Sequence, residues 1–218
     1  MTTEISAYLR LMNWLSPSFP TGSFGYSHGL EYAFEAGLLP SRESFYDWLT
    51  ALISGSCRND AIICALAWET ASNNDSLDAL SELSLSMAGS RGRFTESLEQ
   101  GKSFLKSVKL WDEKIELDDN LPLPIALGAI AQKTEIEKLQ TVAAYLNSFV
   151  SALIQAALRL GRFGQDDGVY LLSKLEAFIL ETATHACTAN IDDLGNMCIM
   201  GEISAMKHEE LRSRIFIT

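Results

Sequence analysis

The chain has 218 residues, of which 47% are hydrophobic and 21% charged, and its formal net charge is −11 at pH 7. These are the proportions of a globular protein, and a chain of this length buries roughly 70% of the surface that its unfolded form exposes. The negative charge repels phosphate backbones and anionic lipid headgroups, which excludes nucleic acid and membrane surfaces as expected partners.

The first fifteen residues, MTTEISAYLRLMNWL, include an early acid, and polar residues interrupt every apolar run. We therefore expect neither a signal peptide nor a transmembrane span. The cysteines lie at irregular spacing inside apolar segments, a pattern typical of reduced, buried thiols in a cytoplasmic protein. They are Cys57, Cys64, Cys187 and Cys198.

The spacing of apolar residues predicts helices through the first half of the chain. The first stripe runs from Ile5 to Leu15 and ends at Ser16, because a residue that precedes proline is disfavoured in helical space. A second stripe runs from Phe45 to Ile53. Asp60 and Asp75 are each placed to cap the amino terminus of a further helix.

The helical pattern continues in the second half. A stripe from Phe94 to Val108 predicts one helix, and the capping-box spacing of Thr134–Glu137 introduces the longest stripe, from Leu139 to Leu158. We expect Gly161 and Gly164 to end that helix.

A last long helix is predicted from Leu171 to Thr182. No segment alternates apolar and polar residues over the length of a strand, and no repeat or change of composition marks a domain boundary. We therefore expect an all-α fold, with residues 1–218 forming a single domain of about eight to ten helices.

One stretch, SPSFPTGSFGYSHGLE at residues 16–31, interrupts the helical pattern. Its prolines end the first helix and hold an extended path, while its glycines permit turns closed to other residues. Ser23 or Ser27 can then cap a helix from His28 to Ala36, with Gly37 at its carboxyl end.

The sequence shows no catalytic constellation. Its three histidines are far apart, and the glycines of TGSFGYSHG match neither a phosphate-binding loop nor a dinucleotide-binding fingerprint. Cys57 and Cys64 are two helical turns apart, which would suit two thiolate ligands, but a core stripe explains the same spacing. His185 and Cys187 point to different faces of a helix, which favours a buried histidine over a metal ligand.

Four segments carry a family resemblance. Residues 16–31 follow the pattern S-P-x-x-P-x-G-x-F-x-Y-S-x-G-L-E, and RFTESLEQGKSFL, AALRLGRFGQDDGVYLL and EISAMKHEELRSRIFIT follow in order. Together they resemble the signature of the urease accessory protein UreF family. The matching residues for which we expect structural roles are Arg93, Gly101, Arg159, Gly164 and Gln165.

The chain departs from the family pattern in several places. Arg212 stands where the family has tyrosine, and Glu202 stands where it has aspartate. Arg162–Phe163 replace the usual proline and leucine before Gly-Gln. The histidine that the family carries in its middle segment is missing near residues 121–128. A role assigned to that histidine therefore does not transfer to this chain.

The resemblance implies an all-α homodimer that does no chemistry of its own. Members of the family sit between the GTPase UreG and the scaffold protein UreD, also called UreH. That assembly acts on apo-urease while the active-site lysine is carbamylated and nickel is delivered. We therefore expect a non-catalytic adaptor that binds no cofactor stably, handles nickel only transiently and contributes to a passage for nickel ions.

The resemblance and the composition together suggest two docking segments. We name residues 16–29 the docking loop, where exposed aromatic side chains on a glycine-hinged loop suit recruitment of the GTPase better than a plain connector would. The residues expected to take part are Phe19, Gly22, Phe24, Tyr26, Ser27 and Glu31.

The second segment is the C-terminal tail, residues 207–218, whose sequence KHEELRSRIFIT ends on an apolar cluster. The resemblance implies that it binds the scaffold UreD/UreH, and an arginine suits that role because its planar fork can hold a carboxylate or several carbonyls. The alternative is that the phenylalanine packs into the chain's own core. The residues expected to take part are His208, Glu209, Arg214 and Phe216.

Two other functions stay open at this point. The chain could be a stand-alone nickel-binding carrier, with metal held by the Cys57 and Cys64 pair or by the His185 and Cys187 pair. It could also be an all-α hydrolase that acts through Ser27, although no strand-turn elbow or acid partner is signalled.

Overall fold

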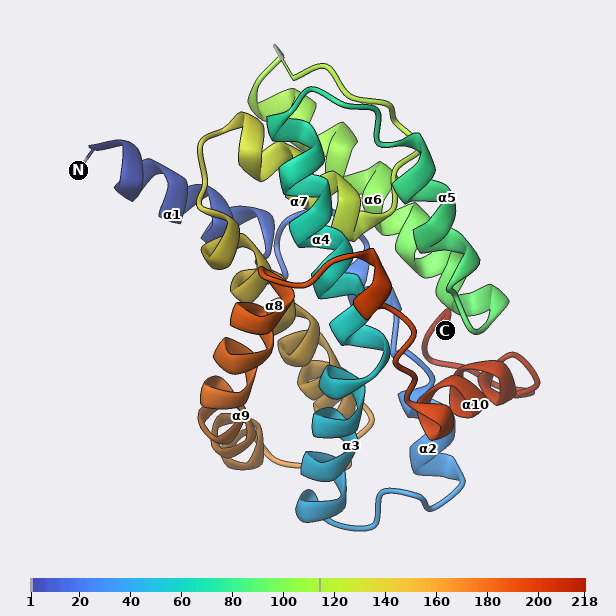
Figure 1. Cartoon of the computed structure of the whole chain (residues 1–218). Helices are drawn as coiled ribbons and strands as arrows, with labels where there is room; N and C mark the ends of the chain where they lie inside the picture. The colour runs from blue at the N-terminus through green and yellow to red at the C-terminus, as the bar shows by residue number, and fades with distance from the viewer. Residues whose placement is uncertain (1, 114) are drawn as a thin grey trace.

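The computed structural model describes residues 2–113 and 115–218. Within them the chain forms ten α-helices and two short 3-10 helices without a β-strand (Figure 1), which confirms the predicted all-α fold. The α-helices are α1 (Thr2–Trp14), α2 (Leu30–Glu35), α3 (Arg42–Ser54), α4 (Ser56–Ser72), α5 (Asp78–Ser86), α6 (Arg91–Trp111), α7 (Leu123–Lys133), α8 (Lys138–Arg159), α9 (Gln165–Ala186) and α10 (Ile199–His208). The 3-10 helices are η1 (Ser23–Gly25) and η2 (Ile191–Asp193).

Helix α4 is the central element of the core. It is buried around most of its circumference and contacts α3, α7, α8 and α9. Helix α7 approaches it closely because Gly128 has no side chain: a Cβ built there would lie 2.2 Å from the carbonyl oxygen of Cys64.

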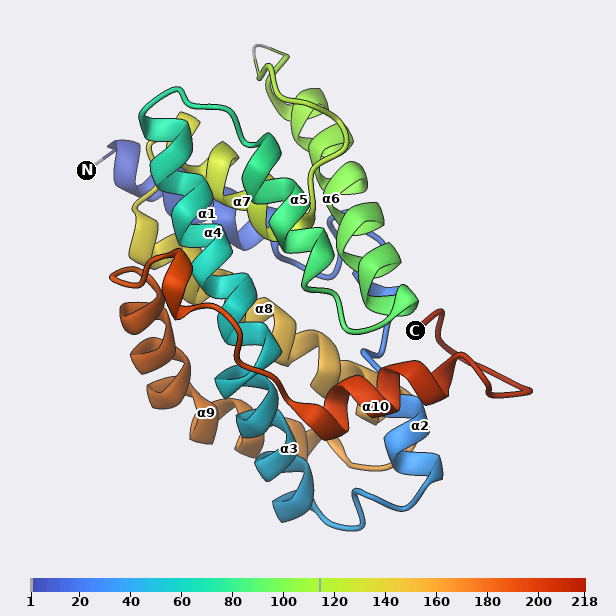
Figure 2. The same ribbon diagram turned by 45° about the vertical axis from the view of Figure 1, so that its right-hand side comes forward.

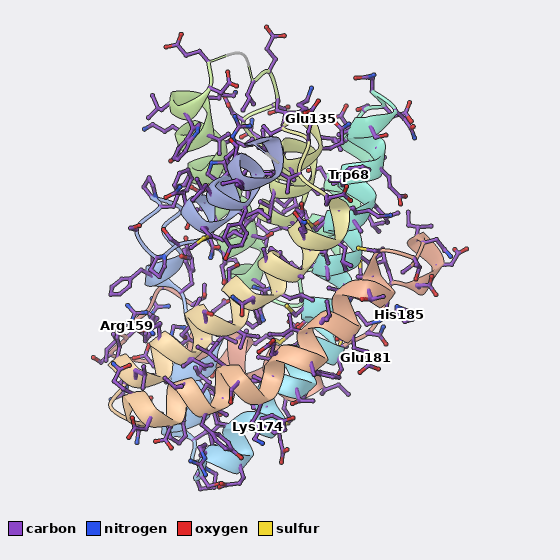
Figure 3. The ribbon with its side chains drawn as sticks, turned by 90° about the vertical axis from the view of Figure 1, so that its left-hand side faces the viewer. Trp68, Glu135, Arg159, Lys174, Glu181 and His185 are labelled. Carbon is purple, nitrogen blue, oxygen red and sulfur yellow. The ribbon has the colours of Figure 1, made fainter. Side chains whose placement is uncertain are left out.

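Helices α8 and α9 form a long antiparallel pair on one side of α4 (Figure 3). Each has 22 residues, and the short turn between them contains Gly161 and Gly164, as predicted. Helix α8 is long and apolar enough, by length and composition alone, to cross a membrane. Half of that apolar window is buried inside the protein, as in a core helix.

Helix α2 and the end of the chain lie together, away from the N-terminus (Figures 1 and 2). Helix α2 lies beside α10 in both ribbon views (Figures 1 and 2), and the two helices are in contact. The residues after α10 turn back toward the docking loop and the start of α6. This arrangement places the docking loop and the C-terminal tail next to each other.

The three predicted amino-terminal caps are wrong. Asp60 lies inside α4, where its carboxylate accepts hydrogen bonds from side chains instead of capping amides. Asp75 does not cap α5, whose N-cap is Leu77; the N–H of Asp78 instead donates to the hydroxyl of Ser76. Thr134 donates its hydroxyl hydrogen to the carbonyl of the preceding helix, so Thr134–Glu137 forms no capping box.

Helix α7 is an element that the sequence pattern did not reveal. Eight of its residues are buried, so no polar face interrupts the apolar run to produce a helical period. Helix α6 approaches the start of α7 through Gly101, where a Cβ would lie 2.0 Å from the carbonyl oxygen of Leu121. Close packing of backbone thus explains the expected structural role of Gly101.

Candidate functional site

The docking loop and the C-terminal tail are joined by main-chain hydrogen bonds. The N–H of Ile217 donates to the carbonyl of Gly25 at 2.8 Å, and the N–H of Ser27 donates to the main-chain oxygen of Thr218 at 2.7 Å. The hydroxyl of Ser27 donates to the same oxygen at 2.6 Å. The two segments that we predicted as separate docking surfaces therefore form one connected structure.

Glu31 holds the tail from the side of α2. Its carboxylate accepts the N–H groups of Ile215 at 2.8 Å and Phe216 at 3.0 Å, and it lies 3.0 Å from Nε2 of His208. Burial alone would raise the pKa of Glu31, but these hydrogen bonds outweigh it and hold the pKa below its usual range. Glu31 and His208 are buried, so neither side chain lies at the surface of the chain, and their part in partner binding stays a prediction.

The aromatic residues of the docking loop divide into one exposed and two inward-facing side chains. Phe24 is 65% exposed, as predicted, but Tyr26 is only 9% exposed. Phe19 is half-buried, with its ring against those of Phe104 and Trp111. The predicted exposure of Tyr26 and Phe19 is therefore wrong, because both rings pack beneath the loop.

The next feature of the docking loop is the backbone conformation of Gly22 and the hydrogen bonding of Ser27. Gly22 has the left-handed φ of 79° that its turn requires. The hydroxyl oxygen of Ser27 accepts from the N–H of Glu31 at 3.4 Å, but α2 begins at Leu30 with Gly29 as its N-cap, so the predicted serine cap of a helix from His28 is wrong. Ser27 is fully buried and its hydroxyl is engaged, which argues against its use as a nucleophile.

The tail residues also divide between surface and core. Phe216 is 3% exposed and belongs to the hydrophobic core, as the core alternative expected, while its part in partner binding stays a prediction. Glu209 is exposed, but its carboxylate already accepts the N–H of Gly92 near the start of α6 at 3.0 Å. Arg214 is exposed, as a docking residue must be.

Arg159 connects the loop and the tail through their aromatic rings. Its guanidinium carbon lies 3.5 Å from the ring centre of Phe24 and 4.3 Å from that of Phe216. The same motif places Gly164 at the amino-terminal cap of α9 and Gln165 as the first residue of that helix. The family residues of this segment thus position the α8–α9 turn and anchor the docking loop.

A buried charged cluster lies behind the docking loop. Arg93 forms ion pairs of 3.2 Å with both Asp60 and Glu96, and Nδ1 of His28 lies 3.8 Å from Glu96. Burial raises the pKa of Asp60. For Glu96, the charge of Arg93 overcomes the effect of burial and lowers the pKa to about 2. Arg93 is thus the buried cation that pairs with both carboxylates of this cluster.

The tail is also tied to this cluster, because the hydroxyl of Thr218 donates to Glu96 at 3.1 Å. The pKa of His28 is lowered, first by burial and then by the charge of Arg93. The sequence pattern did not indicate that His28 and Asp60 lie beside Arg93 and Glu96. The spacing of Arg93 and Glu96, one helical turn apart, was the only local signal of the cluster.

An open groove with a volume of about 790 Å³ lies between α1, the docking loop and α8, with the charged cluster at its floor. One wall consists of apolar α1 residues such as Tyr8 and Met12. A smaller hollow of about 40 Å³ opens behind the same cluster, lined by Glu202 among others. Both spaces are lined by Asp60 and Arg93.

The two residue pairs considered as metal ligands lie in different environments, one in the core and one at the end of α9. Cys57 and Cys64 are buried in the core on α4, and burial raises the pKa of both thiols. Nδ1 of His185 lies 3.5 Å from the guanidinium of Arg58, while Cys187 follows the end of α9. Among residues 2–113 and 115–218, no three His, Cys, Asp or Glu side chains are grouped to hold a metal ion.

The chain is similar in sequence to known proteins. The UreF family model matches residues 39–176. The chain is 40% identical to the urease accessory protein UreF 1 of Brucella anthropi over 100% of this chain and 96% of that protein. It is 41% identical to the UreF of Brucella ovis (97% and 94% covered). The UreF of Mesorhizobium japonicum is also 41% identical, with 96% of each chain covered. The chain therefore belongs to the UreF family of urease accessory proteins.

Proposed function

We propose that this chain is a non-catalytic adaptor in urease maturation. It bridges the GTPase UreG and the scaffold UreD/UreH on apo-urease, and it supports the insertion of nickel without binding a cofactor stably. The observation that carries the proposal is the direct joining of the docking loop to the C-terminal tail, by Ser27 and Thr218, in a member of the UreF family. Such a connection allows binding of a partner at one surface to change the affinity of the other surface for its own partner.

The GTPase-facing surface is centred on Phe24. This side chain is held in place by Arg159 yet exposes most of its ring, so it loses little conformational freedom when a partner covers it. Gly22 and the neighbouring turn set its position on the rim of the groove. Tyr26, Ser27 and Glu31 support the loop from below instead of touching the partner.

The scaffold-facing surface consists of the exposed part of the tail and the outer face of α10. Arg214 offers a guanidinium, and Ile215 and Ile217 are 68% and 58% exposed beside it. The outer face of α10 adds apolar residues at helical spacing, which is typical of a protein interface. They are Ile199, Met200, Ile203 and Met206.

We further propose that the adaptor is a homodimer. Helix α1 contacts the rest of the chain through one face only, and its other face exposes large apolar side chains. Burial of such a face against a second copy is the usual solution for a symmetric assembly. The exposed residues are Ile5, Tyr8, Leu9 and Met12. Light scattering at micromolar concentration is expected to show the dimer mass, and a monomer would contradict this part of the proposal.

The groove and the small hollow support a transient role in moving nickel. Carboxylates suit passage of a divalent cation, and Asp60, Glu96 and Glu202 line the two spaces that meet at the charged cluster. Arg93 balances two of these carboxylates, which favours passage over tight storage. Nickel is cargo in this account and not a resident cofactor.

The decisive experiment is reconstitution with purified UreD, UreG, apo-urease, nickel and bicarbonate. We expect the chain to co-purify with UreD and UreG and to raise urease activity, whereas the isolated chain binds no nickel stoichiometrically in equilibrium dialysis. If the chain does not bind either accessory protein, the adaptor proposal is wrong. Stoichiometric nickel binding by the isolated chain would instead support the stand-alone carrier.

A further inference from the structure

The polarity of helix α10 is the reverse of that of an ordinary surface helix, which buries apolar residues and exposes polar ones. Its only acid, Glu202, is buried, and so are the polar residues Ser204 and His208. Every exposed residue of the helix except Lys207 is apolar. A chain with 28 acidic residues thus places none of them on the outer face of α10. The exposed apolar residues are Ile199, Met200, Ile203 and Met206.

Packing inside the molecule accounts for the inner face of α10. The helix lies on the outside of the bundle, beside α2 (Figure 2). A Cβ at Gly29 of α2 would lie 2.4 Å from the main-chain nitrogen of Ala205, and a Cβ at Gly201 would lie 2.8 Å from the side chain of Leu52. Such close approach leaves little room for large side chains on the inner face. The outer face has no such neighbour, so the packing of the chain does not account for its isoleucines and methionines.

Methionine is concentrated at this outer face. Three of the six methionines of the chain fall within ten residues, at positions 197, 200 and 206. Met200 and Met206 are 46% and 48% exposed on α10, and Met197 is exposed just before the helix. A thioether is flexible and polarisable, which suits contact with a partner, and unlike the side chain of isoleucine it is open to oxidation.

The thiols of the chain are less accessible to an oxidant than these thioethers. Cys57 and Cys64 are fully buried, and Cys198 is nearly so. Burial raises the pKa of Cys198 and of the half-buried Cys187, so little of the reactive thiolate forms on either at pH 7. A peroxide in limited amount should therefore react at the exposed methionines first.

We propose that Met200 and Met206 are an oxidation site that changes the outer face of α10 from apolar to polar. In each residue a lone pair of the thioether sulfur attacks one oxygen of hydrogen peroxide. An S–O bond forms and the O–O bond breaks, and the proton of the transferred oxygen moves to the other oxygen, which leaves as water. The sulfur is oxidised by two electrons to the sulfoxide, and the peroxide is reduced.

The consequence of this reaction is weaker docking. A sulfoxide is polar, so a partner that covers the face loses apolar contact and must desolvate a new acceptor. The inference rests on the proposed adaptor function, which makes this face the surface for UreD, and it adds control of that docking by an oxidant.

The first test maps the reaction on the full chain. The chain is treated with a limiting amount of hydrogen peroxide, catalase removes the excess, and peptide mass spectrometry gives the extent of sulfoxide at each methionine. We expect Met200 and Met206 to be oxidised before Met87, which is half-buried against the core. Circular dichroism checks that the oxidised chain keeps its helices. If Met200 and Met206 stay reduced while Met87 is oxidised, the inference is wrong.

The second test measures the dissociation constant of purified UreD for the treated and the untreated chain. We expect treatment to raise this constant by about tenfold or more. In a variant with both Met200→Leu and Met206→Leu, the ratio of the two constants should be close to one, because leucine is apolar and has no sulfur. Met12→Leu is the matched control, since it removes an exposed methionine of α1 and should leave the ratio at its wild-type value.

Reversal identifies the oxidised group. Methionine sulfoxide reductases act on the sulfoxide, whereas dithiothreitol alone reduces disulfides and sulfenic acids. We expect the reductases to restore the affinity of the treated wild-type chain for UreD and dithiothreitol alone to leave it low. If the double leucine variant does not bind UreD before treatment, this comparison on the wild-type chain decides the question.

Four outcomes distinguish this inference from the adaptor proposal. Unchanged affinity of the oxidised chain for UreD defeats the inference and leaves the adaptor proposal intact. A double leucine variant that loses affinity on treatment as the wild type does would assign the effect to other residues. Recovery with dithiothreitol alone would assign it to a cysteine. If the untreated wild-type chain does not bind UreD, both proposals fail together.

Discussion

The carboxylate of Glu31 accepts the main-chain N–H of Phe216 at 3.0 Å, although 185 residues separate them in the chain. The same carboxylate accepts the N–H of Ile215 and lies within hydrogen-bond distance of His208. One buried side chain at the start of the chain thus holds three groups of its end. The docking loop and the C-terminal tail are one structural unit because of this acceptor and the Ser27–Thr218 pair.

The first prediction concerns this acceptor. In Glu31→Gln the amide NH₂ replaces one of two accepting oxygens and faces donors, so the free energy of unfolding should fall by about 1–3 kcal/mol. Hydrogen exchange at the amides of Ile215 and Phe216 should become faster. Glu35→Gln is the control, because Glu35 is exposed on the same helix. Equal stability of the two variants in denaturant titrations would contradict the role given to Glu31.

The second prediction tests the contact between α2 and α10. Gly29 and Gly37 have left-handed φ angles of 75° and 72°, so alanine at either position is strained by about 1–2 kcal/mol. At Gly29 a Cβ would also lie 2.4 Å from the main-chain nitrogen of Ala205, whereas nothing lies within 4 Å at Gly37. We expect Gly29→Ala to cost about 1–3 kcal/mol more than Gly37→Ala in denaturant unfolding. Equal costs would show that α2 and α10 are not tightly apposed.

The third prediction concerns pH. The pKa of Glu96 falls from 4.5 to about 2 on folding, so its contribution to stability is complete above pH 4.5 and is lost as the pH falls toward 2. The lowered pKa of His28 acts in the same direction, because below its ordinary value of 6.5 the unfolded chain binds the proton first. Unfolding at a series of pH values should show stability falling below pH 6.5 through His28 and again below pH 4.5 through Glu96, with the raised pKa of Asp60 opposing part of the loss.

The Glu96→Gln variant tests whether Glu96 causes the loss of stability below pH 4.5. Glu96→Gln leaves Arg93 with one carboxylate instead of two, so it should lower stability at pH 7 by about 3–5 kcal/mol and flatten the dependence between pH 4.5 and 2. Glu99→Gln, at an exposed position on the same helix, should preserve the wild-type slope. A Glu96→Gln variant with an unchanged slope would rule out Glu96 as the titrating group.

The sequence was informative where a helix has one apolar and one polar face. The stripes from Phe45 to Ile53 and from Leu139 to Leu158 correspond to α3 and α8. They could be recognised because one face of each helix is exposed to solvent and polar, so the apolar residues recur with the helical period of 3.6 residues. Helix α7 was missed for the opposite reason, since it is buried on nearly all sides. The caps predicted at Asp60 and Asp75 are wrong. Asp60 lies inside α4 and accepts a hydrogen bond from Arg93, and the hydroxyl of Ser76, not the carboxylate of Asp75, accepts from the N–H of Asp78.

The candidate site was predictable in its segments but not in the orientation of its side chains. Motif resemblance located the loop and the tail, yet the burial of Tyr26, Glu31 and Phe216 depends on the return of the tail across the chain. A contact between residues so distant in sequence leaves no local pattern. Of the predicted docking residues, the structure leaves Gly22, Phe24, Glu209 and Arg214 exposed at the surface.

The fourth prediction separates Phe24 from Tyr26, two of the three aromatic residues of the docking loop. Phe24→Ala should leave the melting temperature nearly unchanged and weaken UreG binding about 30-fold, because an exposed aromatic anchor contributes roughly 2 kcal/mol at an interface. Tyr26→Ala should instead lower the free energy of unfolding by about 3 kcal/mol, since it empties a buried site. A large loss of stability in Phe24→Ala, or normal UreG binding by that variant, would contradict the assignment.

The last prediction concerns the C-terminal tail. A chain truncated after Glu210 loses the buried ring of Phe216 and deprives Glu31 of two main-chain donors, so its stability should fall by about 3–5 kcal/mol. Loss of UreD binding in that variant would therefore report unfolding as much as docking. Arg214→Ala is the sharper probe, because Arg214 is exposed and its removal should change stability by less than about 0.5 kcal/mol.

We expect folded Arg214→Ala to lose UreD in a pull-down while Arg212→Ala retains it, since both arginines are exposed in the same tail and only Arg214 occupies the position of the family's tail arginine. Equal loss in the two variants would indicate a general electrostatic attraction instead of a specific contact. Full UreD binding by Arg214→Ala would remove the tail arginine from the scaffold interface and leave the apolar face of α10 as the surface that docks.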